Sequence, residues 1–244
     1  MDIGGSLART PDGLTPADAL NADLYPDLIE AGGLAAALRQ VAHAEHLDLG
    51  EIKVQNEWGR SAFTTARLTA DRGAMAVLLG GDSHRFSISA GQPFRDPGWV
   101  SGSTPDLAEA ARMLAAWRTG VKLRELTARF PFLEYPPISQ GYEDGTPVPA
   151  QWKIVLTDQE AETYRDLLTA LHADDVTGGM FPYLSMFTLR LAADPYDMSA
   201  AEVVVARGPE EGGYRVSSSA AEGERLVRGI GETVEAVRDL SRKP

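Results

Sequence analysis

Two short stretches of this sequence resemble each other: residues 65–71 read TARLTAD, and residues 188–194 read TLRLAAD. They are identical at five of seven positions. A second pair, RFSISA at 85–90 and RVSSSA at 215–220, is identical at four of six positions and follows in the same order. Segments repeated in a fixed order indicate a repeated structural unit. The sequence therefore predicts an internal duplication, with the limited choice of residues in strands as the alternative explanation.

The matched stretches lie where apolar and polar residues alternate, a period typical of β-strands. Turn formers such as DRG and GGDS separate the alternating segments, as expected for strands joined by hairpins. Each half is therefore predicted to hold an antiparallel β-meander whose first and last strands carry the matched stretches. The expected strands are residues 63–70, 74–79 and 85–90 in the first half and residues 186–193, 202–206 and 214–218 in the second.

Helical spacing of apolar residues precedes and follows each meander. Ser103 or Thr104 is expected to cap one of these helices, with proline as its first residue. Thr157 and Glu160 form a capping-box pattern before another. The expected helices are residues 26–46, 103–117, 122–130, 157–172 and 227–237. The predicted fold class is α+β, with two similar units that are each an antiparallel β-meander flanked by helices.

The segment that joins the two halves is rich in proline, glycine and carboxylates, but it also contains Phe130, Phe132 and Tyr135. These side chains are too apolar for a solvated linker, so we expect the segment to pack into a groove between the halves. The expected organisation is a flexible N-terminal tail at 1–25, a first α+β unit at 26–130, a junction at 131–150 and a second α+β unit at 151–244.

Composition excludes several classes of protein. The 244 residues include no cysteine, which excludes disulfides, cysteine-based metal sites and thiol nucleophiles and is consistent with a cytoplasmic protein. No stretch approaches the length of apolar sequence that spans a membrane. Lys and Arg number 23 against 35 Asp and Glu, and the net charge of −12 repels nucleic acid and anionic lipid. Neither nucleic acid nor a membrane is therefore an expected partner.

No motif for a common cofactor is present, since the sequence lacks a P-loop, a dinucleotide fingerprint and a G-x-S-x-G elbow. His43 and His46 lie three residues apart on an expected helix, but no third ligand is evident. The sequence therefore predicts neither a cofactor nor a metal.

The repeated strands supply the first candidate site. Arg67 lies two residues after Thr65, and Arg190 lies two residues after Thr188, so each pair shares one face of its strand. Two guanidinium groups brought together by a pseudo-twofold axis could clamp a carboxylate or a sulfate. The alternative is that both are solvent-facing arginines, repeated because the unit was repeated.

Two further groups of residues are candidates. Trp58 and Tyr183 precede the expected first strands, where aromatic and hydroxyl groups suit a small-molecule pocket, although core anchoring is the commoner use. Glu134 and Tyr135 lie in the junction. A carboxylate that is partly buried there could act as a general base, and the alternative is a solvated loop acid.

Two longer runs carry a resemblance to a known family: TPDLAEAARMLAAWRTGVKLRELTARFPFLE at 104–134 and MFPYLSMFTLRLAADPY at 180–196. They resemble the signature segments of an actinobacterial family of natural-product biosynthesis proteins, and the resemblance covers roughly residues 55 to 240. It implies a cytoplasmic subunit of a biosynthetic enzyme that acts on a small or carrier-bound amino-acid-derived intermediate. In azinomycin-type pathways, it further implies a heterodimer with a smaller partner that closes an aziridine ring and expels sulfate.

That chemistry needs a group that takes a proton from an amine, and cations near the leaving sulfate. Glu134 is the residue expected for the first role, and Arg67 and Arg190 for the second. Thr188, Trp58, Tyr135 and Tyr183 are the other expected substrate contacts. The alternative function is a non-catalytic interaction protein of the chaperone, immunity or scaffold type. A deep cleft lined by arginine and carboxylate would favour the enzyme, whereas a flat apolar face would favour the interaction protein.

Overall fold

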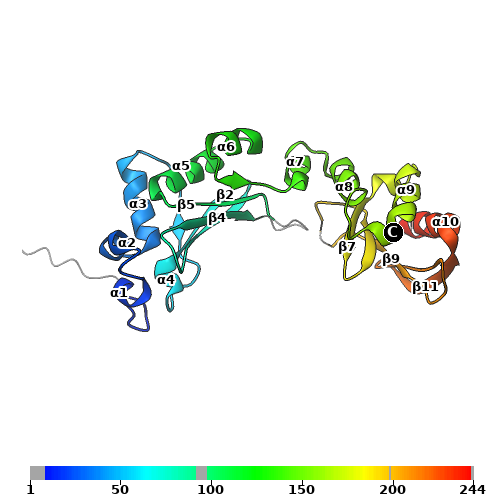
Figure 1. The fold of residues 1–244 in the computed structure, drawn as a ribbon, viewed down its shortest axis with the longest axis horizontal. Coiled ribbons are helices and arrows are strands. Elements are labelled where there is room, and N and C mark those ends of the chain that lie inside the picture. The colour runs from blue at the N-terminus through cyan, green and yellow to red at the C-terminus, as the bar shows by residue number, and fades with distance from the viewer. Residues whose placement is uncertain (1–8, 92–97, 198, 243–244) are drawn as a thin grey trace, which may run out of the picture. The chain divides into compact units, whose positions relative to one another are not determined.

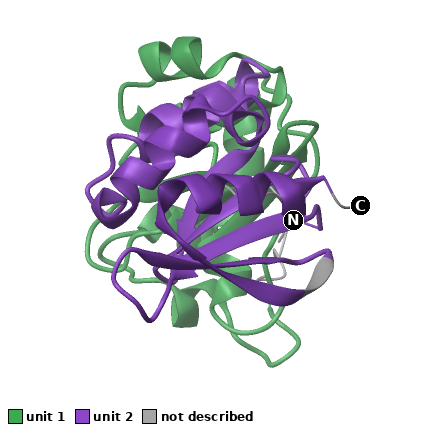
Figure 2. Ribbon diagram, turned by 90° about the vertical axis from the view of Figure 1, so that its right-hand side faces the viewer, with its two compact units in different colours: residues 1–136 green, residues 137–244 purple. Residues whose placement is uncertain are grey.

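The computed structural model describes residues 9–91, 98–197 and 199–242, and the chain divides into two compact units (Figures 1 and 2). Unit 1 covers Met1–Pro136 and unit 2 covers Pro137–Pro244. Each unit combines helices with one antiparallel sheet, so the α+β class is confirmed.

Unit 1 contains a sheet whose six strands follow one another in sequence order, β1-β2-β3-β4-β5-β6, with every neighbouring pair antiparallel. This arrangement contains the predicted three-strand meander as β2, β3 and β4, extended by β1 at one edge and by β5 and β6 at the other. The elements are α1 (Pro16–Ala19), α2 (Pro26–Ala31), α3 (Leu34–Ala44), β1 (Ile52–Lys53), α4 (Ser61–Thr64), β2 (Thr65–Ala70), β3 (Gly73–Leu79), β4 (Phe86–Gly91), β5 (Val100–Thr104), α5 (Leu107–Arg118), α6 (Leu123–Arg129) and β6 (Leu133–Glu134).

Local chemistry sets the boundaries of the unit 1 helices. The helix expected over 26–46 is split into α2 and α3 because Gly32 and Gly33 adopt φ values of 94° and 108°, which end a right-handed helix. The cap of α5 is Asp106, which accepts hydrogen bonds from the amides of Ala108 at 2.8 Å and Glu109 at 3.1 Å. Neither Ser103 nor Thr104 is the cap, because both belong to β5.

The core of unit 1 lies between its sheet and the packed pair α3 and α5. The alternate residues that face these helices are buried, among them Leu68, Val77 and Ile88. At the edge of this core the Arg72 guanidinium lies 4.2 Å from the centroid of the Trp117 ring and 5.5 Å from that of Trp99. The arginine is therefore held by two cation–π contacts.

The described part of the expected N-terminal tail is packed on unit 1. Ala19, Leu20 and Tyr25 are all buried. The Tyr25 hydroxyl lies 2.9 Å from the carbonyl oxygen of Gly80 and accepts a hydrogen bond from the amide of Arg85 at 3.1 Å. Residues 9–25 therefore close one side of the first unit, and residues 1–8 of the expected tail lie outside the described residues.

Unit 2 contains a five-stranded meander in the order β11-β10-β9-β8-β7, again antiparallel throughout. The elements are α7 (Pro137–Glu143), α8 (Pro147–Val155), the 3-10 turn η1 (Glu162–Tyr164), α9 (Arg165–Ala173), the 3-10 turn η2 (Thr177–Gly179), β7 (Phe181–Ser185), β8 (Thr188–Ala192), β9 (Glu202–Arg207), β10 (Gly213–Ser218), β11 (Ala221–Arg228) and α10 (Gly229–Ser241). The capping box expected at Thr157 does not start a helix, since the next regular turn is η1.

One face of the unit 2 sheet is covered by α9 and α10, which also pack on each other (Figure 2). Leu189, Leu191, Val203, Val205 and Val216 point to this face and are essentially unexposed. The residues between them point to the opposite face, which these helices leave open. That face carries the polar side chains described below.

The expected junction at 131–150 is not a separate segment. Leu133 and Glu134 form β6 and complete the unit 1 sheet, whereas residues from Pro137 onward form α7 and α8 of unit 2. Phe130 and Leu133 are buried and Phe132 is half-buried. The apolar residues of the junction are therefore explained by packing at the ends of regular elements.

The repeated stretches are the second and fourth strands of their meanders, and not the first and last as expected. TARLTAD begins with β2 and TLRLAAD with β8, and each is preceded by a strand that the sequence did not indicate, β1 or β7. Likewise β5 follows β4, and β11 follows β10. None of the helices in the described part of the chain is long and apolar enough to cross a membrane.

Candidate functional site

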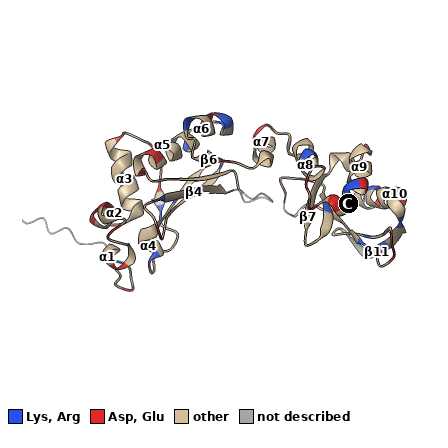
Figure 3. Ribbon diagram, in the orientation of Figure 1, with Lys and Arg blue, Asp and Glu red and all other residues tan. Residues whose placement is uncertain are grey.

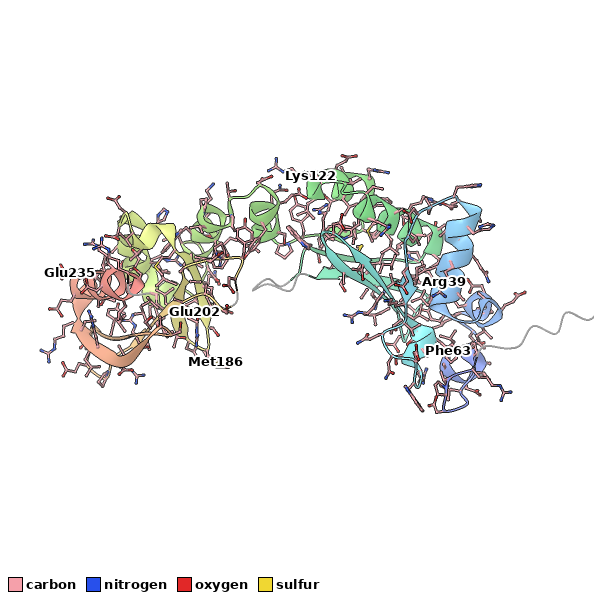
Figure 4. All side chains as sticks on the ribbon, turned by 180° about the vertical axis from the view of Figure 1, so that it is seen from behind. Arg39, Phe63, Lys122, Met186, Glu202 and Glu235 are labelled. Atoms are coloured by element: carbon pink, nitrogen blue, oxygen red, sulfur yellow. The ribbon has the colours of Figure 1, made fainter. Side chains whose placement is uncertain are left out.

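The β7–β8 hairpin of unit 2 brings together two of the residues expected from the sequence. Tyr183 on β7 lies directly opposite Arg190 on β8, so both side chains point to the open face of the sheet. Glu202 joins them from β9: it pairs with Ala192, two residues beyond Arg190 on the same face. Tyr183, Arg190 and Glu202 are called the polar cluster below, and Figure 4 labels Glu202 in it.

Within the polar cluster, Glu202 accepts hydrogen bonds from the other two residues. Tyr183 Oη donates to Glu202 Oε1 at 2.5 Å, and Arg190 Nη1 donates to Glu202 Oε2 at 3.0 Å. The Glu202 side chain is only 12% exposed, and that of Arg190 is 34% exposed. The hydrogen bond to Glu202 raises the pKa of Arg190 above its usual value, so the guanidinium stays charged at physiological pH.

Arg190 keeps one donor that the protein does not use. Its Nε atom is buried and has no hydrogen-bond partner among the described residues. A buried donor without a partner is unfavourable, and such groups in folded proteins usually have a reason. A bound anion would instead meet the exposed third of the Arg190 side chain, a cation whose charge is only partly neutralised by Glu202.

Aromatic rings line one side of the polar cluster. The Phe181 ring lies 6.5 Å from that of Tyr183 and 6.2 Å from that of Tyr142, and the Tyr196 ring lies 5.5 Å from that of Tyr142. Phe181 and Tyr142 are buried, whereas Tyr196 is 43% exposed. The arrangement therefore places a hydrophobic wall beside a cation and a carboxylate, which suits a small polar molecule with an apolar part.

Thr188 contributes to the shape of the hairpin. Its Oγ1 donates a hydrogen bond to the carbonyl oxygen of Ser185 at 2.6 Å, across the turn between β7 and β8. Its expected role in substrate binding is not tested by this contact. In unit 1 the corresponding Thr65 is buried and bonded to Gln55 and Ser61.

The expected residues of unit 1 do not converge on one point within that unit. Register places Arg67, Ala76, Ser89, Ser101 and Glu134 in one row across five neighbouring strands. Arg67 and Glu134 are thus separated by four strand spacings of about 4.8 Å, roughly 19 Å in total. Both side chains are exposed, so no single small ligand bound within unit 1 would contact both directly.

The remaining two expected residues also lie in unit 1. Trp58 is 57% exposed in the turn before α4, where its amide donates to Asn56 Oδ1 at 3.1 Å. Tyr135 is half-buried directly after β6. Neither belongs to the polar cluster, which lies wholly in unit 2.

Three hollows on the surface of the described residues lie away from the polar cluster. One of about 190 Å³ is lined by residues of the β9–β10 turn and the end of β11, including Tyr214 and Arg228. One of about 520 Å³ lies between α7 and α8. The third, about 540 Å³, lies on unit 1 beside Arg112 and Phe130. The chemistry of the polar cluster, and not the size of a hollow, makes it the candidate site.

Sequence reasoning missed Glu202, the residue on which the polar cluster converges. Once this segment is taken as a strand, the alternation of side chains places Glu202 and Val204 on the face opposite the buried Val203 and Val205. A carboxylate that opens a strand on the same face as Arg190 was a possible partner for it. Which strands are neighbours, however, depends on the sheet order.

No group of three or more His, Cys, Asp or Glu side chains within the described ranges is arranged to hold a metal ion. Comparison of the chain with protein-family models, with curated proteins and with solved structures found no match in any of the three. The resemblance to natural-product biosynthesis proteins therefore stays a prediction, and the polar cluster is the feature from which a function is argued.

Proposed function

We propose that this chain is a substrate-binding subunit of a cytoplasmic enzyme of natural-product biosynthesis, acting on a small amino-acid-derived intermediate. The observation that supports the proposal is the partly exposed guanidinium of Arg190, held by Glu202 beside Tyr183 and an aromatic wall. Such a group suits an anionic oxygen on a small molecule. The reaction we propose, by resemblance, is aziridine ring closure with elimination of sulfate.

In that reaction the lone pair of the substrate amine attacks the neighbouring carbon and forms the C–N bond. The C–O bond to sulfate breaks, and sulfate leaves with the bonding electrons. The amine proton goes to a base. In our proposal Arg190 holds the sulfate as negative charge develops on it, and Tyr183 fixes the guanidinium through their shared carboxylate, Glu202.

Glu202 is poorly suited to be the base, because both of its oxygens already accept hydrogen bonds from the polar cluster. We propose that a carboxylate or histidine of the smaller partner subunit takes the proton. A negative chain also needs a more basic partner if the substrate is bound to an acidic carrier protein. Figure 3 colours the positions of acidic residues red, and these occur on helices of both units, consistent with the net charge of −12.

The proposal is tested by sulfate release from a sulfated amino-alcohol intermediate, with this chain and its partner present. Arg190→Lys removes Nε and the planar fork, and loss of a charged hydrogen bond of roughly 1.5–3 kcal/mol predicts a KM raised by roughly 10- to 100-fold. Arg215→Lys is the matched control, since Arg215 is an exposed strand arginine of the same unit. Equal KM values for the two variants would remove the polar cluster from the site.

The second candidate function is a non-catalytic interaction protein. The specific observation in its favour is that unit 2 exposes large apolar side chains, namely Met186, Phe187 and Leu226. Under this alternative the chain binds another protein and the polar cluster only stabilises the hairpin. Arg190→Lys would then leave sulfate release by the complex unchanged, while truncation of the apolar side chains would weaken the complex.

We also propose that the two units arose by duplication. In support, the order α3, β1–β5, α5 in unit 1 corresponds to α9, β7–β11, α10 in unit 2, and in each unit the two helices pack on each other. The matched stretches occupy the second and fourth strands of each sheet, although the unit 1 sheet has β6 as a sixth strand. The registers qualify the second match. In unit 1, Leu68 pairs with Met75, which pairs with Ala90. In unit 2, Leu191 pairs with Val203, which pairs with Ser218. The sequence match instead requires Ala220 at the position of Ser218. A two-residue offset preserves the face of the strand, so superposition of the two sheets is the test.

A further inference from the structure

The turn between β7 and β8 consists of Met186 and Phe187, and both side chains are almost fully exposed. Their exposed fractions are 88% and 97%. Scattered exposed apolar residues are ordinary, but two adjacent large ones at the end of a hairpin form a projecting apolar surface. Figure 4 shows Met186 at the end of the unit 2 sheet, with Glu202 further along it. The pair is called the apolar tip below.

The backbone of the apolar tip is unusual for these residue types. Met186 and Phe187 have φ values of 48° and 63°, so both lie in the left-handed region. A two-residue hairpin turn of this kind strongly favours Asn-Gly, because a Cβ is unfavourable there. Two large apolar residues therefore stand where they disfavour folding and are not buried. Strain of this kind in a folded protein is a reason to look for a function.

Hydrogen bonds from both sides hold the apolar tip in place. The buried Tyr164 donates from Oη to the carbonyl oxygen of Phe187 at 3.0 Å. Thr188 Oγ1 bonds the carbonyl oxygen of Ser185, the residue before the turn. Because these bonds fix the backbone of the tip, binding need not order the backbone further, which favours association.

We propose that the apolar tip inserts into an apolar pocket of a second protein, one whose net charge is positive. Only the identification of that second protein as the partner subunit rests on the proposed function. Charge selects the occupant: a net charge of −12 repels anionic membranes and a second copy of this chain, and it attracts a basic protein. A buried aromatic side chain at the centre of such an interface is a typical hot spot.

The apolar tip lies close to the polar cluster. Tyr183 lies three residues before Met186, and Arg190 lies three residues after Phe187, on the two strands of the same hairpin. At about 3.3 Å per residue, the polar cluster lies roughly 10 Å from the tip. A protein that holds the tip would therefore approach the open face beside Arg190, where it could supply the missing base.

The first experiment replaces Phe187 by the photo-crosslinking amino acid p-benzoylphenylalanine in the full-length chain, expressed in its native host. The same substitution at Leu226, which is 68% exposed on β11, is the matched control. We expect one discrete adduct from position 187 with a basic protein, and none with that protein from position 226. Absence of an adduct from position 187, or an adduct with lipid or a second copy of the chain, would overturn the proposal.

The second experiment compares the wild type with the double variant Met186→Asn with Phe187→Gly, which retains the turn geometry, using the crosslinked protein in purified form. We expect the double variant to bind at least 100-fold more weakly. Unchanged affinity would refute the role of the tip and leave the proposed function intact. Loss of affinity together with a wild-type complex that releases no sulfate would confirm the tip and refute the proposed reaction.

Discussion

Replacing Met186 by Asn and Phe187 by Gly is expected to stabilise unit 2 while it removes the apolar tip. Both residues have left-handed backbones, and each Cβ there costs roughly 1–2 kcal/mol. Asn tolerates this region and Gly carries no Cβ, so roughly 2–3 kcal/mol is recovered. Glycine lowers this gain in stability by up to about 1 kcal/mol, because it has more conformational freedom in the unfolded chain. Little packing is lost, since the two side chains are 88% and 97% exposed. The expected net gain is roughly 1–2 kcal/mol.

Calorimetry and urea unfolding, followed by circular dichroism, measure this gain. For a unit of this size, 1 kcal/mol corresponds to roughly 4–8 °C in the melting temperature, so unit 2 should melt about 5 °C or more above the wild type. The double variant Met186→Ala with Phe187→Ala is the control, because alanine keeps the Cβ and should give no such gain. Equal melting temperatures for the Asn-Gly and Ala-Ala variants would refute the assignment of strain to this turn.

Three further predictions concern stability. The hydrogen bond from Arg238 lowers the pKa of Asp174 from 3.8 to about 2; because the folded pKa lies below the unfolded one, this pair stabilises unit 2 above about pH 4 and loses its effect as the pH falls towards 2. Asp174→Asn should therefore lower the urea midpoint at pH 6 but not at pH 2, and an equal loss at both pH values would contradict this reasoning. Arg72→Ala should destabilise unit 1 by roughly 1–2 kcal/mol through its two tryptophan contacts, whereas Arg72→Lys should recover part of that loss in the same urea assay. Phe130→Ala should cost roughly 3–5 kcal/mol because Phe130 is buried, and a loss at the half-buried Phe132 of the same size would contradict that difference.

The polar cluster and the apolar tip belong to the same hairpin, so enzymatic activity is expected to depend on assembly with the partner. Arg190 is held by Glu202 and Tyr183 without any partner protein, so the cation is already in place. What the cluster lacks is a group that accepts a proton. Activity of the isolated chain on the sulfated intermediate should therefore be low, and addition of the partner should raise the rate of sulfate release.

Local patterns were sufficient to predict the class of the fold. Alternation of apolar and polar residues identified β2, β3, β4, β8, β9 and β10 to within a few residues, because side chains on a strand point to opposite faces by geometry alone. Gly32 and Gly33 lower the helical propensity of the sequence because glycine has a flexible backbone, and in the structure the same two residues separate α2 from α3. Strands β1 and β6 are only two residues long and show no period, so the sequence could not reveal them.

The candidate site depended on tertiary structure to a greater degree. The sequence selected Tyr183 and Arg190 by residue type and place, and the hairpin register sets them opposite each other. Glu202 completes the polar cluster only because β9 is the neighbour of β8, which no local pattern states. In the same way, the separation of Arg67 from Glu134 follows from the order of five strands. Residue types and periods are local properties of the chain, whereas convergence of side chains requires hydrogen-bonded neighbours that are distant in sequence, and so only the folded sheet decides it.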